Sequence, residues 1–162
     1  ELHDDLPDCT LEFDLFKISN ALENLIENAV KFGNSKGQLS LYLNTRPAVI
    51  AALESAPTEV EVLERGFLRP QQPLKSPERD TMLVIEVMDD GIGIPSDESR
   101  AIFQPFTQAA NSPTRGVRGA GLGLAMAKHI VDAHGGEILC RSAMEQGTAF
   151  YIAIPIACQR SA

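Results

Sequence analysis

The sequence has no tryptophan, few aromatic residues and three scattered cysteines. Cys9, Cys140 and Cys158 lie far apart, so their spacing predicts neither a disulfide framework nor a zinc site. An odd number of scattered cysteines is typical of a reducing compartment, and we expect a cytoplasmic location. That expectation leaves room for a membrane anchor elsewhere in a longer parent protein.

Two further absences narrow the classes of function. No apolar run is long enough to cross a bilayer, and the first residues lack the basic-then-apolar pattern of a signal peptide. Basic residues are also scarce: 14 Lys and Arg against 22 Asp and Glu give a formal net charge of -8. We therefore expect neither nucleic-acid binding nor direct membrane contact, although a nucleotide can still bind an acidic chain at a local site with a metal ion.

The length and composition fit a single domain over residues 1–162, with 44% hydrophobic residues to form a core. Alternating or β-rich runs predict strands at 38–44 and 82–88, and a closing hairpin of strands at 137–142 and 148–154. Between the first two strands, residues at about 45–80 hold five of the ten prolines. We interpret this stretch as an insertion between two paired strands.

Residues 14–32 show the clearest helical pattern. Apolar residues spaced by three and four predict one buried stripe, made of Leu15, Ile18, Leu22, Leu25, Ala29 and Phe32. Asp14 is suited to cap the start of this helix, and Gly33 with Asn34 is expected to end it.

A second stripe of the same helix carries Asn20, Asn24, Asn28 and Lys31. Asparagine is a poor residue for a helix interior, and Asn24 and Asn28, four residues apart, point the same way. One interpretation is a solvated polar face. The other is a pair of oxygen ligands for Mg²⁺ beside a cation for phosphate oxygens, since Mg²⁺ needs few protein ligands when it also binds phosphates.

The strand at 82–88 leads directly into Asp89-Asp90-Gly91-Ile92-Gly93-Ile94-Pro95. This could be an acidic turn whose aspartates cap local N–H groups. Alternatively, Asp89 accepts a hydrogen bond from the exocyclic amine of a base while Gly91 and Gly93 let the backbone pass beneath the ring. After this turn, residues 97–106 predict a short helix that ends before Pro105, with Phe103 and Phe106 as packing anchors.

A glycine-rich stretch at 116–136 precedes a last helix and ends at Gly135 and Gly136. Its opening glycines are Gly116, Gly119, Gly121 and Gly123. Glycines before a helix allow close approach of a ligand, and the helix N-terminus offers free N–H groups, which suits a phosphate. The polar stretch at 107–118, which carries Arg115 and Arg118, predicts a mobile lid.

The motifs NLIENAVKF, DDGIGIP, IFQPF and GAGLGLA occur in this order. Their order resembles the ATP-binding catalytic domain of sensor histidine kinases, within the superfamily that includes gyrase, Hsp90 and MutL. The resemblance covers nearly the whole chain apart from the insertion. It implies an α/β sandwich (the Bergerat fold): a mixed, mostly antiparallel sheet with three helices on one face and a mobile ATP lid.

The resemblance also implies roles for individual residues. Asn28 matches the Mg²⁺ ligand, Asn24 and Lys31 lie near the phosphates, and Asp89 matches the adenine-reading aspartate. The other residues implied at the nucleotide are Gly91, Gly93, Ile94, Phe106, Arg118, Gly119, Gly121, Leu122, Gly123, Leu124 and Thr148. Two of the positions depart from the usual pattern: Arg118 stands where many members have glycine, and Ala120 where many have Thr or Ser.

The same positions separate kinases from hydrolases. ATPase members generally carry a glutamate, the general base for water, at the position of Asn24, and Glu23 and Glu27 project about 100° away at the helical repeat. Phosphoryl transfer to a neutral histidine needs no such base. None of His3, His129 and His134 lies in a phosphoacceptor pattern, and packing or capping roles suit the last two.

The resemblance thus implies a Mg-ATP-dependent histidine kinase domain that phosphorylates a histidine outside this chain. The expected partners are a dimerisation and phosphoacceptor domain of the same parent and a response-regulator receiver domain, and we expect the isolated domain to be a monomer. The alternative is a catalytically weak signalling module that binds a partner domain. An ATPase is disfavoured by Asn24.

Overall fold

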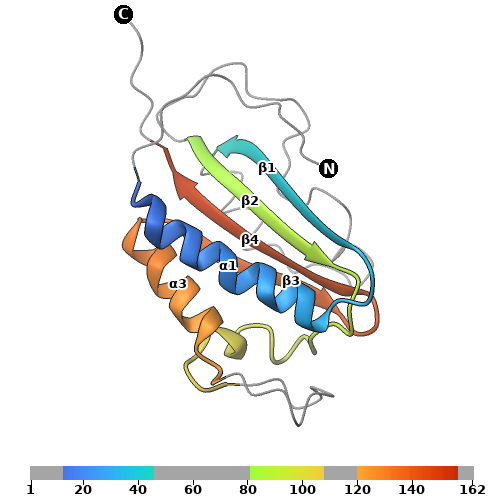
Figure 1. Cartoon of the computed structure of the whole chain (residues 1–162). Coiled ribbons are helices and arrows are strands. Elements are labelled where there is room, and N and C mark those ends of the chain that lie inside the picture. Colours follow the sequence, from blue (N-terminus) through green and yellow to red (C-terminus); the bar gives the residue numbers. More distant parts are fainter. Residues whose placement is uncertain (1–12, 46–80, 108–119, 157–162) are drawn as a thin grey trace, which may run out of the picture.

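The computed structural model describes residues 13–45, 81–107 and 120–156, which form one four-stranded sheet with helices against one face (Figure 1). The strands lie in the order β1 (Gly37–Thr45), β2 (Thr81–Asp89), β4 (Gly147–Pro155) and β3 (Glu137–Ala143). All three pairings between these described strands are antiparallel, so the parallel strand of the expected mixed sheet is not among them. The predicted pairing of β1 with β2 is confirmed, and it places Thr45 opposite Thr81. The expected insertion between them lies almost wholly outside the described residues.

Helix α1 (Leu15–Phe32) begins and ends where the sequence predicts. The Asp14 side chain accepts the N–H of Lys17 at 3.1 Å and caps the first turn. Gly33 ends the helix because a Cβ there would lie 2.3 Å from the Ala29 carbonyl oxygen. The expected burial of Leu15 is wrong, since its side chain is 69% exposed. Leu15 stands at the edge of the stripe, roughly 80° around the helix from Leu25.

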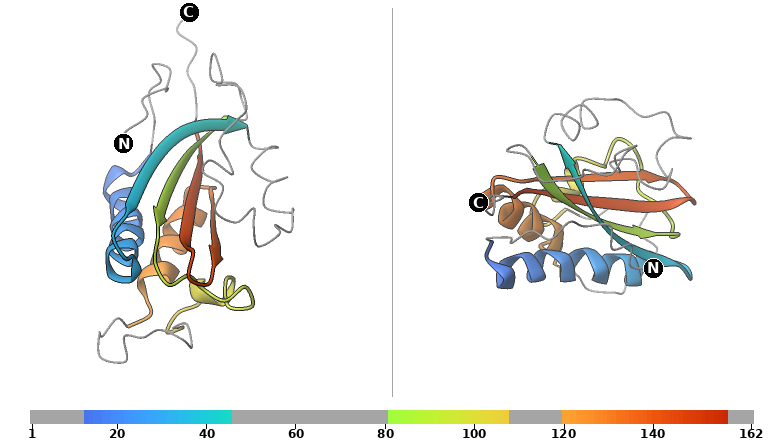
Figure 2. Two further views of the ribbon diagram at one scale, coloured as in Figure 1. Left: turned by 90° about the vertical axis from the view of Figure 1, so that its right-hand side faces the viewer. Right: turned by 90° about the horizontal axis from the view of Figure 1, so that it is seen from above.

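Helix α3 (Gly123–Ala133) packs beside α1 on the same side of the sheet (Figure 2). The core between the helices and the sheet is filled by apolar side chains from α1, α3, β2 and β4, among them Ile18, Leu25, Ile85, Val131 and Ile152. The Nδ1 atom of His134 lies 2.7 Å from the Ile130 carbonyl oxygen at the end of α3, which confirms a capping role.

The short helix expected at 97–106 is reduced to a 3₁₀ helix, η1 (Ala101–Phe103), that follows a series of turns. A stretch this short between two prolines cannot offset the cost of starting an α-helix. Phe103 is the anchor predicted for it, with its ring centroid 6.3 Å from that of Phe150. Phe106 is not an anchor, because it is 76% exposed and has a positive φ of 62°.

In the three described stretches, the helices are all too short or too polar to pass through a lipid bilayer.

Candidate functional site

Asp89 is the last residue of β2, an inner strand of the sheet, and is buried, with 6% of its surface exposed. Its Oδ1 atom accepts the N–H of Gly91 at 2.9 Å. Burial raises the pKa of Asp89 above its ordinary value, and the backbone N–H groups of Gly91 and Thr148 offset only part of that rise. A buried carboxylate with incomplete compensation is suited to accept a further hydrogen bond from a ligand donor.

Asp90, the next residue, has the opposite environment. Its Oδ1 atom accepts the backbone N–H groups of Asn34, Ser35 and Lys36, each at 3.0 Å, and its Oδ2 atom accepts the Ser35 hydroxyl at 3.1 Å. These donors hold the pKa of Asp90 well below its usual range, and the backbone N–H groups of Ser35 and Lys36 have the largest effect. Asp90 therefore caps N–H groups, but these belong to residues 34–36 and not to its own turn, whereas the local N–H group of Gly91 is capped by Asp89.

The two glycines after the aspartates are required by neighbouring backbone. A Cβ at Gly91 would lie 2.0 Å from the Phe32 carbonyl oxygen at the end of α1. A Cβ at Gly93, whose φ is 74°, would lie 2.0 Å from the Ala143 carbonyl oxygen at the end of β3. The turn is thus held between α1 and the β3–β4 hairpin. The predicted passage of the backbone beneath a base stays a prediction.

Ser142 is a residue of the site that the sequence reasoning missed. Its hydroxyl accepts the N–H of Ile94 at 2.8 Å, donates to the Gly147 carbonyl at 2.7 Å and lies 2.9 Å from Thr148 Oγ1. Ser142 thereby ties the Asp89 turn to the start of β4, where Thr148 faces Asp89 across the ladder. The predicted hairpin could have revealed Ser142, because a turn at 144–147 places it opposite Thr148.

Asn24 lies where α1 meets the start of α3. Its Nδ2 atom donates to the Asn20 carbonyl at 2.8 Å, and its Oδ1 atom would lie 2.7 Å from a Cβ at Gly123. A side chain at position 123 would therefore displace the Asn24 amide from this place. The arrangement turns the amide oxygen of Asn24 toward the first residue of α3.

The other two residues of the polar stripe lie further along α1. Asn28 and Lys31 lie in the last two helical turns of α1, and both side chains are partly exposed. The Lys31 ammonium lies 5.0 Å from the centroid of the Phe32 ring. The Phe32 carbonyl accepts the N–H of Ile92 at 3.4 Å and lies against Gly91, so the last turns of α1 and the end of β2 share one end of the sheet (Figure 1).

The glycine-rich stretch enters the site from the opposite side. Gly121 has a φ of 66°, and its carbonyl accepts the N–H of Phe106 at 2.9 Å. Leu124 packs against the helix-side core, whereas Leu122 is 43% exposed. Within the described residues, the N-cap residue Leu122 makes no side-chain hydrogen bond to the start of α3, and the first N–H groups of a helix are a favourable place for an anion.

Several predicted residues cannot be placed in this site. Arg118 and Gly119, and the predicted lid apart from Thr107, lie outside the described residues. Ala120 is exposed and immediately precedes Gly121.

The metal ligands that the polar stripe of α1 could offer are amide oxygens, which suit a hard cation such as Mg²⁺. In the part of the chain that the structure describes, no group of three or more His, Cys, Asp or Glu could hold a metal ion. A Mg²⁺ ion would therefore depend on amide oxygens, water and the phosphates of a ligand, a combination that it accepts. Glu23 and Glu27, the carboxylates nearest to the stripe in sequence, are both exposed.

The chain is similar to known proteins over nearly its whole length. The family described as "Histidine kinase-, DNA gyrase B-, and HSP90-like ATPase" matches residues 14–157. The chain is 33% identical over 157 residues to the autoinducer 2 sensor kinase/phosphatase LuxQ of Vibrio vulnificus, covering 96% of this chain and 15% of that protein. It is 31% identical to the sensor histidine kinase WalK of Bacillus subtilis, covering 93% of this chain and 20% of WalK.

Solved structures show the same fold. Full-length ShkA in complex with AMPPNP superposes with a TM-score of 0.59 at 25% identity, over 94% of this chain and 24% of that one. The mycobacterial sensor histidine kinase MprB gives a TM-score of 0.59 at 24% identity, over 92% of this chain and 78% of that one. This chain spans a fifth or less of the LuxQ and WalK sequences, so it corresponds to one part of such proteins. It belongs to the histidine kinase-, DNA gyrase B- and HSP90-like ATPase family, in which its relatives LuxQ and WalK are sensor kinases.

Proposed function

We propose that this chain is the ATP-binding catalytic domain of a sensor histidine kinase. The observation that supports this most is the buried, incompletely compensated Asp89, beside the polar stripe of α1 and across from the uncapped start of α3. One end of the site offers an acceptor for the amine of a base, and the other offers N–H groups for phosphates. An adenine nucleotide carries both the exocyclic amine and the phosphates that these groups would bind.

The residues divide the work in this proposal. Asp89, supported by Gly91, Gly93 and Thr148, accepts the exocyclic amine of adenine. Asn28 supplies an oxygen ligand to Mg²⁺, with Asn24 and Lys31 toward the phosphates. The bound Mg²⁺ neutralises phosphate charge during transfer. Gly119, Gly121 and Gly123 offer backbone N–H groups to the phosphates, with Ile94, Phe106, Arg118, Leu122 and Leu124 around the nucleotide.

Transfer to histidine is favoured over hydrolysis by the residues around Asn24. Hydrolysis needs a general base to activate water, and the amide of Asn24 cannot serve as one. Glu23 and Glu27 are exposed on α1 rather than turned toward α3. A neutral imidazole is already a nucleophile, so the domain has only to position the γ-phosphate and neutralise its charge.

The acceptor histidine belongs to a dimerisation domain elsewhere in the parent protein, which then serves a response-regulator receiver. Exposed apolar side chains give that partner a place to dock: Phe106, Leu122 and Met126 are 76%, 43% and 52% exposed. The hydrogen bond from Phe106 to Gly121 holds the first of them near the other two. Without the dimerisation domain, the isolated chain is a monomer in the cytoplasm.

Calorimetric titration with ATP, with and without Mg²⁺, tests the proposal. We expect Asn28→Ala to remove the gain in affinity that Mg²⁺ gives and to leave Mg-free binding nearly unchanged. Glu27→Gln, an exposed neighbour, is the matched control and should behave as wild type. A folded wild type that binds no ATP would favour a partner-binding module instead. Appreciable release of phosphate by the isolated domain would favour an ATPase.

A further inference from the structure

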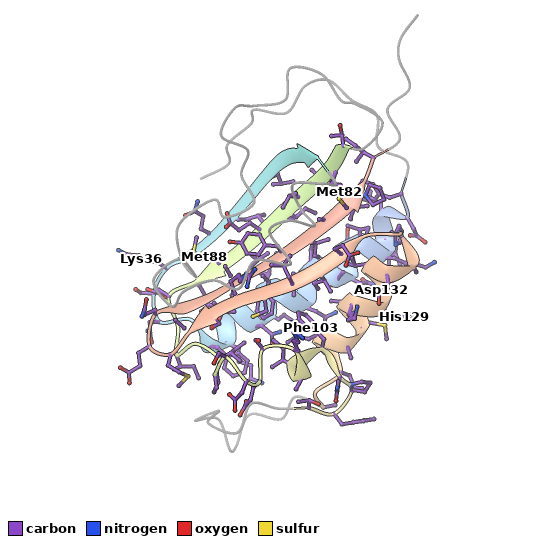
Figure 3. All side chains as sticks on the ribbon, turned by 180° about the vertical axis from the view of Figure 1, so that it is seen from behind. Lys36, Met82, Met88, Phe103, His129 and Asp132 are labelled. Carbon is purple, nitrogen blue, oxygen red and sulfur yellow. The ribbon has the colours of Figure 1, made fainter. Side chains whose placement is uncertain are left out.

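The face of the sheet turned away from α1 and α3 is also buried. Figure 3 shows Met82 and Met88 at the two ends of β2 on this outer face. Its buried apolar side chains form a cluster separate from the helix-side core, made of Met82, Val84, Leu139, Ala149, Tyr151 and Ala153, with Met88 at its border. Among the described elements, α1, α3 and η1 all pack on the other face.

An antiparallel sheet with one solvated face shows polar residues at alternate positions. Strands β2 and β4 do not follow that pattern, because nearly every residue of each is buried. Glu86, in the middle of the outer face, is only 2% exposed, and its buried Oε1 atom accepts no hydrogen bond within the described residues. Since Glu86 and its apolar neighbours are buried, this face is covered by structure rather than by solvent, and a cover that brings a donor to Glu86 would offset the cost of burying its carboxylate.

The burial is deepest at one end of the sheet. Met82 and Val84 are fully buried, whereas Met88 at the far end of β2 is partly exposed. The deeply buried end is the one where Thr45 faces Thr81, the last and first residues of the strands that flank residues 46–80. Residues 1–12 and 108–119 instead adjoin α1 and α3 in sequence, and the tail at 157–162 is much shorter.

We propose that residues 46–80 fold back across the outer face and form its cover, an interface within this chain. The segment carries the apolar residues that such a cover needs, including Val49, Ile50, Leu53, Phe67 and Leu68, and cations such as Arg65 and Arg69 that suit Glu86. At about 3.4 Å per residue, β2 is roughly 30 Å long, which a segment of this length spans easily. The insertion is then a second layer on the sheet rather than a linker.

The four methionines of the chain provide a test, because they report different faces. Met126 and Met144 are 52% and 44% exposed, whereas Met82 is fully buried on the outer face. Cys140 packs on the helix side, so its thiol reports loss of the helix-side core. Each side chain is followed by mass spectrometry after brief treatment with hydrogen peroxide or, in separate samples, a maleimide.

In the full chain we expect Met82 to oxidise at least about tenfold more slowly than Met126, as protection by folded structure requires. Replacing residues 46–80 with an Asn-Gly turn should bring Met82 to within about threefold of Met126 while Cys140 stays unreactive. If Met82 stays protected in that folded, shortened chain, the proposal is wrong. Protection that falls on dilution of the full chain would also overturn it, because a second copy would then be the cover.

A second variant decides the matter if the shortened chain unfolds and Cys140 reacts. Phe67→Asp with Leu68→Asp in the full chain should weaken the cover without removing it, and Glu64→Gln is the matched control. Faster oxidation of Met82 with Cys140 still protected supports the proposal. Oxidation of Met82 at the wild-type rate overturns it.

Discussion

Asp89 and Asp90 are adjacent carboxylates with opposite physical states. Asp89 is buried, its pKa is raised by burial, and its backbone donors leave that cost partly unmet. Asp90 lies in the turn opposite residues 34–36, where three backbone N–H groups and a hydroxyl lower its pKa. The carboxylate that we assign to the ligand is the one whose burial is only partly compensated by hydrogen bonds. The carboxylate that stabilises the fold accepts four hydrogen bonds.

The largest expected effect concerns the ligand. Asp89→Asn should weaken ATP binding by about 100-fold, or about 2.7 kcal/mol, because a hydrogen bond to a charged group is replaced by a poor contact. The circular dichroism spectrum should stay that of the wild type. Calorimetry measures the affinity, and Asp90→Asn is the control whose affinity should be nearly unchanged. Equal losses in the two variants would remove the distinction between the carboxylates.

The next effect concerns the backbone contact between these carboxylates and α1. Gly91→Ala places a methyl group against the Phe32 carbonyl oxygen and near Asp89 Oδ1. Because both atoms belong to fixed structure, we expect a loss of about 2 kcal/mol in the free energy of unfolding. Urea denaturation measures it, with Gly37→Ala as control, since a Cβ at Gly37 would meet no atom closer than 3.8 Å. Similar losses of stability at both positions would show that the close contact of Gly91 with the Phe32 carbonyl does not require glycine.

Asp90→Ala should cost stability rather than binding. The substitution leaves the N–H groups of residues 34–36 without their acceptor, so the melting temperature should fall by less than in Gly91→Ala. ATP affinity measured well below that temperature should match wild type. A large loss of affinity in a folded Asp90→Ala protein would assign this aspartate to the ligand site as well.

The smallest effect is the pH dependence, which has opposite signs at the two positions. For Asp89 the folded pKa is raised, so the unfolded chain releases this proton first. Its contribution to stability therefore falls as pH rises from about 4 into the raised range. For Asp90 the folded pKa is lowered, so its contribution is present above about 4 and is lost as the pH falls below it.

Urea denaturation between pH 3 and 7, of wild type and of each Asp→Asn variant, isolates the two contributions. The stability difference from wild type should change with pH in opposite directions for the two variants. Curves that run parallel would mean that one environment governs both carboxylates.

Local signals predicted much of this molecule. The limits of α1, its Asp14 cap and its end at Gly33 follow from spacing and capping chemistry, and the four strands follow from β-rich runs. The position of Asp89 at a strand end was also readable from the sequence. Each of these features depends on residues within a few positions of one another.

What could not be predicted depends on residues distant in sequence. Leu15 and Phe106 are exposed, although the sequence pattern places both among the packing residues. The donors to Asp90 come from more than 50 positions earlier in the chain. Gly91 and Gly93 look like ligand glycines in sequence, and the contacts with Phe32 and Ala143 appear only in the folded chain.

The β1–β2 ladder has different neighbours at its two ends. One end pairs Gly37 with Asp89 at the proposed nucleotide site, and the other pairs Thr45 with Thr81, which flank residues 46–80. Because the register is fixed by every pair between them, sequence can be added or lost beyond Thr45 without displacing Asp89. A change of length between β1 and β2 would therefore leave the end of the sheet that holds Asp89 in place.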